Sequence, residues 1–123
     1  MFEISVEETF AAGHSLRNYH GKCEKLHGHN YKVQITLEGE KLNEAGLLMD
    51  FVELKRTLHA TVERLDHEFL NDLPPFDVLN PSAENMAKYF YDEVSKALPP
   101  QAGVRVTCVR LWETDTSIAA YRP

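Results

Sequence analysis

Two histidines two residues apart, His27 and His29, are the side chains whose type and spacing point most directly to chemistry. Residues two apart on a β-strand face the same side, roughly 6.6 Å apart along the chain, so two imidazoles can converge on one ion. Gly28 between them carries no side chain to crowd the backbone. Cys23 lies four residues before His27. This stretch therefore offers two nitrogen ligands and a nearby thiol.

A third histidine, His14, is expected to join this pair. Apolar residues alternate with polar ones over residues 2–14, which predicts a half-buried strand, and His14 has the parity of the apolar set. A second strand is predicted from His27 to about Glu38. Both of its histidines occupy the same alternating positions as its apolar residues, so they face the same side. If the two strands pair antiparallel, the end of the first lies beside the start of the second. Parity therefore predicts a three-histidine cluster at one end of a sheet.

Three histidines without a fourth protein ligand are typical of an open catalytic zinc site. The open position lets zinc polarise a substrate oxygen. The alternative is that they are ordinary strand histidines. Cys23 could be a fourth zinc ligand, a redox thiol, an inert core residue or a catalytic base, and the nearby Lys22 and Lys25 favour its thiolate. Cys108 alternates with valines and is predicted to lie in the core.

Two further groups carry possible chemistry. Asp66 directly precedes His67, and a carboxylate beside an imidazole can raise its basicity and hold its tautomer. The alternative is a histidine at a helix C-terminus that interacts with the helix dipole. Glu113 shares a strand face with Val109 and Leu111. It is either a strand-end residue in solvent or an acceptor for a ligand with paired N–H donors.

The remaining elements must position these groups. A helix is predicted over Phe51–Leu65 with Asp50 as its cap, and a second from Asn80-Pro81 to about Leu98. Alternation over residues 103–113 and about Ser117–Tyr121 predicts two more strands. The predicted order is β-β-α-α-β-β, an α+β fold with a four-stranded antiparallel sheet and two helices on one face.

Composition and charge narrow the function classes. The chain has 123 residues, 43% hydrophobic and 26% charged, which predicts one domain over residues 1–123. Its net charge of −6 argues against nucleic acid or an anionic membrane as the main partner. No signal peptide or transmembrane segment is evident, so we expect a cytoplasmic protein whose two cysteines stay reduced.

Several short motifs together resemble the 6-pyruvoyltetrahydropterin synthase and 6-carboxytetrahydropterin synthase family. They occur in family order over nearly the whole chain, and the set is far more specific than any one motif. The matching pieces are Phe10-Ala-Ala-Gly-His14, Cys23-Glu-Lys-Leu-His27-Gly-His29, Gly46-Leu-Leu-Met-Asp-Phe51, Leu65-Asp-His67, Asn80-Pro-Ser-Ala-Glu84 and Trp112-Glu-Thr114.

This resemblance implies a tunnelling fold, in which subunits join their sheets into a barrel. It also implies a homohexamer, a dimer of trimers, with active sites between subunits. Zinc would be held by three histidines, His14, His27 and His29. Cys23 would act as proton acceptor, His67 with Asp66 would support proton transfer, and Glu113 would anchor the pterin ring.

Within the family, a gap of three residues between Cys23 and His27 resembles the carboxy-forming branch, since the pyruvoyl-forming branch typically has a longer gap. The implied reaction converts 7,8-dihydroneopterin triphosphate to 6-carboxytetrahydropterin, with release of acetaldehyde and triphosphate, in queuosine and other deazapurine pathways. The alternatives are pyruvoyl formation, a zinc hydrolase that would not need Cys23, and a non-catalytic pterin-binding protein.

Overall fold

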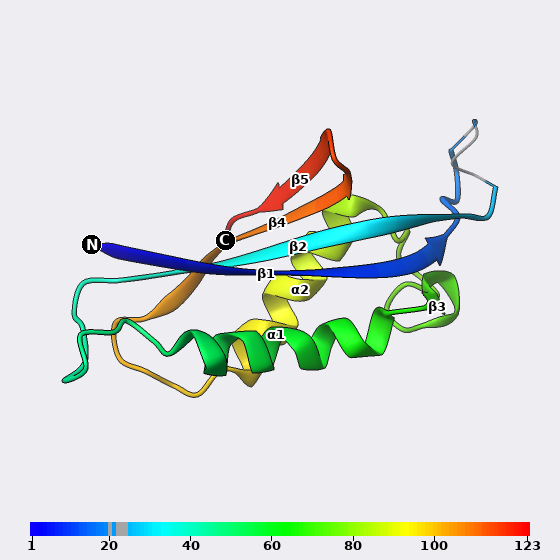
Figure 1. Cartoon of the computed structure of the whole chain (residues 1–123). Coiled ribbons are helices and arrows are strands. Elements are labelled where there is room, and N and C mark those ends of the chain that lie inside the picture. The colour runs from blue at the N-terminus through cyan, green and yellow to red at the C-terminus, as the bar shows by residue number, and fades with distance from the viewer. Residues whose placement is uncertain (20, 22–24) are drawn as a thin grey trace.

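A long antiparallel hairpin forms the centre of the sheet (Figure 1). The computed structural model describes residues 1–19, 21 and 25–123, so Cys23 lies outside the described residues. Strands β1 (Phe2–His14) and β2 (His27–Gly39) pair along their whole length, and their last and first residues lie opposite each other. The bounds of β1 confirm the strand predicted from alternation, and β2 extends one residue beyond its predicted end.

The sheet has five strands in the order β3-β1-β2-β4-β5, where four were predicted. Strands β4 (Arg105–Thr114) and β5 (Ser117–Tyr121) continue the antiparallel pairing from β2. The additional strand, β3 (Glu68–Phe69), runs parallel to β1 and covers part of its outer edge. Two residues are too short for an alternating pattern, so the sequence carries no periodic signal for β3.

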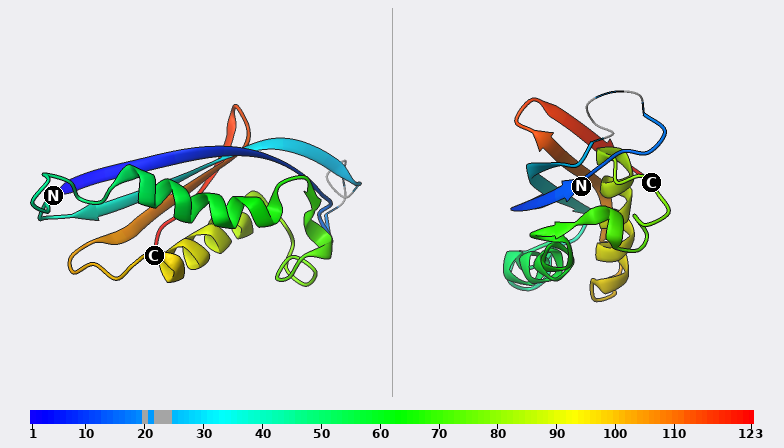
Figure 2. Two further views of the ribbon diagram at one scale, coloured as in Figure 1. Left: turned by 60° about the horizontal axis from the view of Figure 1, so that its bottom comes forward. Right: turned by 90° about the vertical axis from the view of Figure 1, so that its right-hand side faces the viewer.

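Both helices, α1 (Phe51–Leu65) and α2 (Ala83–Ala97), pack on the same face of the sheet, as predicted (Figure 2). The Asp50 side chain caps α1 by accepting a hydrogen bond from the Val52 amide. The predicted start of α2 at Asn80-Pro81 is wrong, because Ser82 caps this helix. No helix in the described part of the chain is long and apolar enough to cross a membrane.

The core lies between the helices and the sheet. Tyr31, Ile35 and Phe90 are completely buried there, and the alternating residues of β1 that face away from the helices are mostly exposed. Burial of one large apolar side chain contributes about 1.5–3 kcal/mol. The core therefore fixes which face of each central strand points toward the helices.

A β-bulge changes which side chains of β4 face the core. The register with β2 shifts between Thr36 and Leu37. Val106 and Val109 are three residues apart and would face opposite sides of a regular strand, but the bulge places both in the core. Cys108 pairs with Thr36 and is buried on the other side of the sheet, where both line a polar hollow with Arg110. Cys108 is buried, as predicted, but on the opposite side of the sheet from the main core cluster.

The end of β2 generates a stability prediction. A Cβ atom on the buried Gly39 would lie 2.8 Å from the carbonyl oxygen of Gly103 and 2.7 Å from a methyl group of Leu48. Backbone would have to move, so Gly39→Ala should lower the free energy of unfolding by about 1–3 kcal/mol, measured by urea denaturation.

Gly28→Ala is the matched control for this substitution. A Cβ there would meet Ala12 O at 3.6 Å, an ordinary contact, and the position is exposed. Its free energy of unfolding should stay within about 0.5 kcal/mol of that of the unsubstituted protein. Equal losses in the two variants would contradict the steric argument.

Candidate metal centre

Four side chains from three adjacent strands converge at one end of the sheet. His14 ends β1, His27 and His29 begin β2, and Glu113 lies near the end of β4. Their possible ligand atoms all lie within 4.8 Å of one another. The Nε2 atom of His14 is 2.9 Å from Nε2 of His27 and 3.2 Å from Oε1 of Glu113. The predicted meeting of the three histidines is confirmed, and Glu113 joins them.

Main-chain carbonyls determine which ring nitrogens face this cluster. His14 donates from Nδ1 to the carbonyl oxygen of Pro81, and His27 donates from Nδ1 to that of Lys25, each at 2.7 Å. A carbonyl oxygen only accepts, so both rings carry their proton on Nδ1. Two Nε2 lone pairs therefore face each other at 2.9 Å. This arrangement is unfavourable unless a proton or a metal cation lies between them.

Burial disfavours the proton. It lowers the pKa of His14, which is 0% exposed, against the raising effect of the hydrogen bond to Pro81 and of the Glu113 charge. Burial also lowers the pKa of His29. Among the described residues, Nε2 of His29 is buried without a hydrogen-bond partner, since its 3.4 Å approach to Glu113 lacks hydrogen-bond geometry. Neutral imidazoles with free Nε2 atoms are metal ligands.

The spacing of these atoms fits a metal ion. Ligand atoms bound tetrahedrally at about 2.0–2.1 Å lie roughly 3.3 Å from one another. The 2.9 Å between Nε2 of His14 and Nε2 of His27 is close to this value, and all four candidate ligand atoms lie within 4.8 Å of one another. Histidines that hold a metal usually donate their other ring nitrogen to a carbonyl or carboxylate, as His14 and His27 do. The group can therefore hold a divalent cation.

The cluster rests on the aromatic end of the core. Tyr31 is completely buried, its hydroxyl lies 3.2 Å from Nδ1 of His14, and its ring stacks on Phe10 at 5.2 Å. Burial raises the pKa of the Tyr31 hydroxyl, so it stays protonated. The ring of Tyr31 packs edge-on against the rings of His14 and His29, at 5.9 and 5.5 Å between centroids, and closes that side of the cluster.

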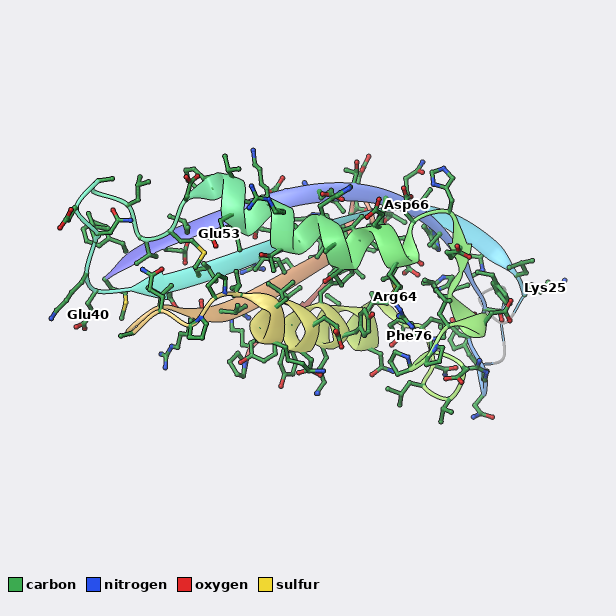
Figure 3. All side chains as sticks on the ribbon, turned by 90° about the horizontal axis from the view of Figure 1, so that it is seen from below. Lys25, Glu40, Glu53, Arg64, Asp66 and Phe76 are labelled. Carbon is green, nitrogen blue, oxygen red and sulfur yellow. The ribbon has the colours of Figure 1, made fainter. Side chains whose placement is uncertain are left out.

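Asp66 and His67 lie beside the cluster and are not part of it. Asp66 follows α1 (Figure 3), and its Oδ1 accepts a hydrogen bond from the Ala11 amide at 3.0 Å. That bond is the main cause of the lowered pKa of Asp66, and His67 lowers it further. Nδ1 of His67 lies 2.9 Å from Asp66 Oδ1, while the imidazole is 81% exposed. His67 and His29 line one shallow hollow of about 390 Å³.

The groups that orient the candidate ligands were not predicted from the sequence. The carbonyls of Pro81 and Lys25, which orient two of the histidines, are main-chain atoms, so no residue type reveals them. Cys23 cannot be compared with its predicted role because it lies outside the described residues. The motif Asn80-Pro-Ser-Ala-Glu84 is part of the family resemblance and contains Pro81. It was therefore the one sequence signal that could have pointed to a role for Pro81 beyond the start of a helix.

The fold and the cluster together define a class of protein, the α+β proteins of the tunnelling fold. A solved 6-pyruvoyl tetrahydropterin synthase from Caenorhabditis elegans superposes with a TM-score of 0.90 at 24% identity, covering 99% of this chain and 95% of that one. A Plasmodium vivax enzyme of the same name superposes with a TM-score of 0.81. At these identities the likeness concerns the fold.

The sequence matches the model of the 6-pyruvoyl tetrahydropterin synthase family over residues 3–123, and the chain belongs to this family. It is 36% identical to 6-carboxy-5,6,7,8-tetrahydropterin synthase of Bacillus subtilis, over 99% of this chain and 86% of that protein. It is 34% identical to human 6-pyruvoyl tetrahydrobiopterin synthase, over 98% and 90%. The expected membership of a lyase family that acts on pterins is therefore confirmed.

The geometry predicts that the protein binds one divalent metal ion per chain. His29→Ala should abolish this binding, because it removes a buried nitrogen that has no hydrogen-bond partner among the residues the structure describes. Metal content after gel filtration, measured by mass spectrometry, tests this. His59→Ala is the control, since that imidazole is 60% exposed and pairs with Glu8. Full occupancy in His29→Ala would exclude the proposed ligand set.

Proposed function

We propose that this protein is a zinc-dependent 6-carboxytetrahydropterin synthase. It would convert 7,8-dihydroneopterin triphosphate and water to 6-carboxytetrahydropterin, acetaldehyde and triphosphate, as a step of queuosine biosynthesis. The observation that carries the proposal is the convergence of three histidine nitrogens in a chain of this family. Three nitrogens and an exchangeable position are typical of catalytic zinc.

Each residue of the cluster has a proposed role. His14, His27 and His29 would hold zinc, which would polarise oxygens of the substrate side chain. Glu113 would accept the paired N–H donors of the pterin ring, since its carboxylate is 27% exposed and within reach of a ligand at the cluster. The buried Tyr31 and Phe10 would exclude water from the inner side.

Proton transfer would be carried out by Cys23 and His67. Cys23, four residues from His27 in the sequence, would accept a proton at Sγ. Asp66 holds Nδ1 of His67, which leaves Nε2 of that exposed imidazole free to exchange a proton. Because the pKa of Asp66 is lowered, its carboxylate stays ionised and continues to orient the ring at neutral pH.

The assembly proposed for this chain is a hexamer, a dimer of trimers. In the described part of the chain, β3 covers only Ala12 and Gly13 of β1, and β5 forms the other edge of the sheet. Open edges of this kind favour pairing with another copy. Such pairing would leave active sites between subunits. We propose a cytoplasmic location, with neither nucleic acid nor membrane as a partner.

The product distinguishes the two branches of the family. Relatives of both names match at similar identity, so identity does not discriminate between them. The three residues between Cys23 and His27 support the carboxy-forming branch. The alternative within the family is 6-pyruvoyltetrahydropterin, formed with loss of triphosphate and without release of acetaldehyde.

Incubation of the zinc-loaded protein with 7,8-dihydroneopterin triphosphate should yield 6-carboxytetrahydropterin and acetaldehyde, identified by mass spectrometry. A pyruvoyl product would move the protein to the other branch. Bound but unchanged substrate would identify a non-catalytic pterin-binding protein. Release of phosphate with the pterin side chain intact would indicate a zinc hydrolase.

Two variants separate the roles of the site. Cys23→Ala should keep zinc and pterin binding but lose turnover, because a proton-transfer role acts mainly in the transition state. Glu113→Gln should keep zinc and weaken pterin binding by about 1–3 kcal/mol, since one acceptor becomes a donor that faces a donor. Zinc content, pterin affinity and turnover are measured on both. Zinc loss in Cys23→Ala would make the thiol a ligand, and zinc loss in Glu113→Gln would make the carboxylate one.

A further inference from the structure

The chain that leaves His14 is held by two asparagine side chains. Asn71 accepts a hydrogen bond from the Ser15 amide at 2.9 Å and donates to the Ser15 carbonyl at 2.8 Å. Asn80 accepts from the Arg17 amide at 2.8 Å and donates to the Arg17 carbonyl at 2.7 Å. Each amide bonds both main-chain groups of one residue, as a neighbouring strand would. In each pair the side-chain oxygen accepts and the side-chain nitrogen donates, so the two hydrogen bonds together fix the orientation of the amide.

Asn80 also adjoins the support of the first histidine ligand. The next residue, Pro81, supplies the carbonyl that accepts from Nδ1 of His14. The carbonyl of Asn80 accepts a hydrogen bond at 2.9 Å from the side chain of Asn85, in the first turn of α2. Two hydrogen bonds, joined by the peptide bond between Asn80 and Pro81, therefore connect α2 to the ring of His14.

We propose that Asn71 and Asn80 are positioning residues for the metal centre, an inference that rests on the proposed function. They fix the backbone at Ser15 and Arg17, directly after His14, and Asn80 in addition holds the Pro81 carbonyl against the His14 ring. His14 Nε2 then points at the other ligands without reorganisation when the ion binds. The Pro81 carbonyl touches the ligand and not the metal, and loss of such a partner changes metal affinity by about 10–100-fold, which is the upper limit for residues that act through it.

The simpler interpretation is that both asparagines only stabilise loops. Asn43 provides the comparison, because its side chain accepts hydrogen bonds from the amides of Ala45 and Leu47 at 2.9 and 3.1 Å. That turn lies beyond the end of β2, at the opposite end of the sheet from the metal centre (Figure 1). Loss of the Asn43 side chain removes a similar number of loop hydrogen bonds without touching the His14 support.

The test compares zinc affinity in Asn80→Ala, Asn71→Ala and Asn43→Ala, measured by competition with a chromophoric chelator. Asn80→Ala should bind zinc about 10-fold more weakly, at the lower end of the range for a partner that touches the ligand itself, and Asn71→Ala should show a smaller loss, since it acts only through Ser15. Asn43→Ala should keep the unsubstituted affinity even where its melting temperature falls. Unchanged affinity in both Asn80→Ala and Asn71→Ala would overturn the inference.

Asn80→Asp provides a second, size-matched variant. It keeps the acceptor for the Arg17 amide but sets a carboxylate oxygen against the Arg17 carbonyl, so it should lose zinc affinity as Asn80→Ala does. If Asn80→Asp binds zinc as tightly as the unsubstituted protein, the hydrogen bond from the Asn80 side chain to the Arg17 carbonyl has no positioning role.

A metal-free measurement separates this inference from the proposed function. The Nδ1 proton of His14, hydrogen-bonded to Pro81, should give a protected imidazole resonance in the metal-free protein. That resonance should be lost in Asn80→Ala and kept in Asn43→Ala. If the unsubstituted protein bound no zinc, the proposed function would fail, while this resonance would still decide whether Asn80 orients His14. A resonance retained in Asn80→Ala would refute the positioning role.

Discussion

The register of β1 against β2 is the constraint on which the rest of the site depends. His14 lies directly opposite His27, and Ala12 lies opposite His29. A shift by one residue would turn every side chain of one strand to the other face and separate the ligands. The same faces carry core side chains such as Phe10 and Tyr31, which stack on each other. Core burial therefore holds the metal ligands in place. A shift of register would disrupt the core packing and the ligand cluster together.

Strand β1 also links the two chemical groups of the molecule. Ala11 donates its amide proton to Asp66, and its carbonyl accepts from the His67 amide at 2.6 Å. Three residues later, the same strand ends in His14. The exposed imidazole of His67 and the buried cluster are thus attached to one short, fully paired segment. Their relative position is set by one main-chain hydrogen bond and one bond from the main chain to the Asp66 carboxylate, both to Ala11.

Alternation and parity predicted the central strands and the meeting of the three histidines, and the three- and four-residue spacing of apolar residues predicted both helices. Each depends on a period that residue types display. The pattern failed where no period exists. The strand β3 has two residues, and the bulge at Thr36 and Leu37 changes the face of Val106 without any change of composition. The carbonyl of Pro81 was missed for another reason, since every residue carries a carbonyl and only the fold selects one.

The wide separation of the cluster residues along the chain affects how the protein folds. The cluster combines residue 14 with residue 113, so it is complete only after β4 has docked on β2. Contacts between such distant residues require closure of long loops and form late. An ion that binds the finished cluster stabilises the native state by mass action and has little to bind in the folding transition state. Bound metal would therefore slow unfolding and leave the folding rate almost unchanged, so its main effect would be on the lifetime of the native state.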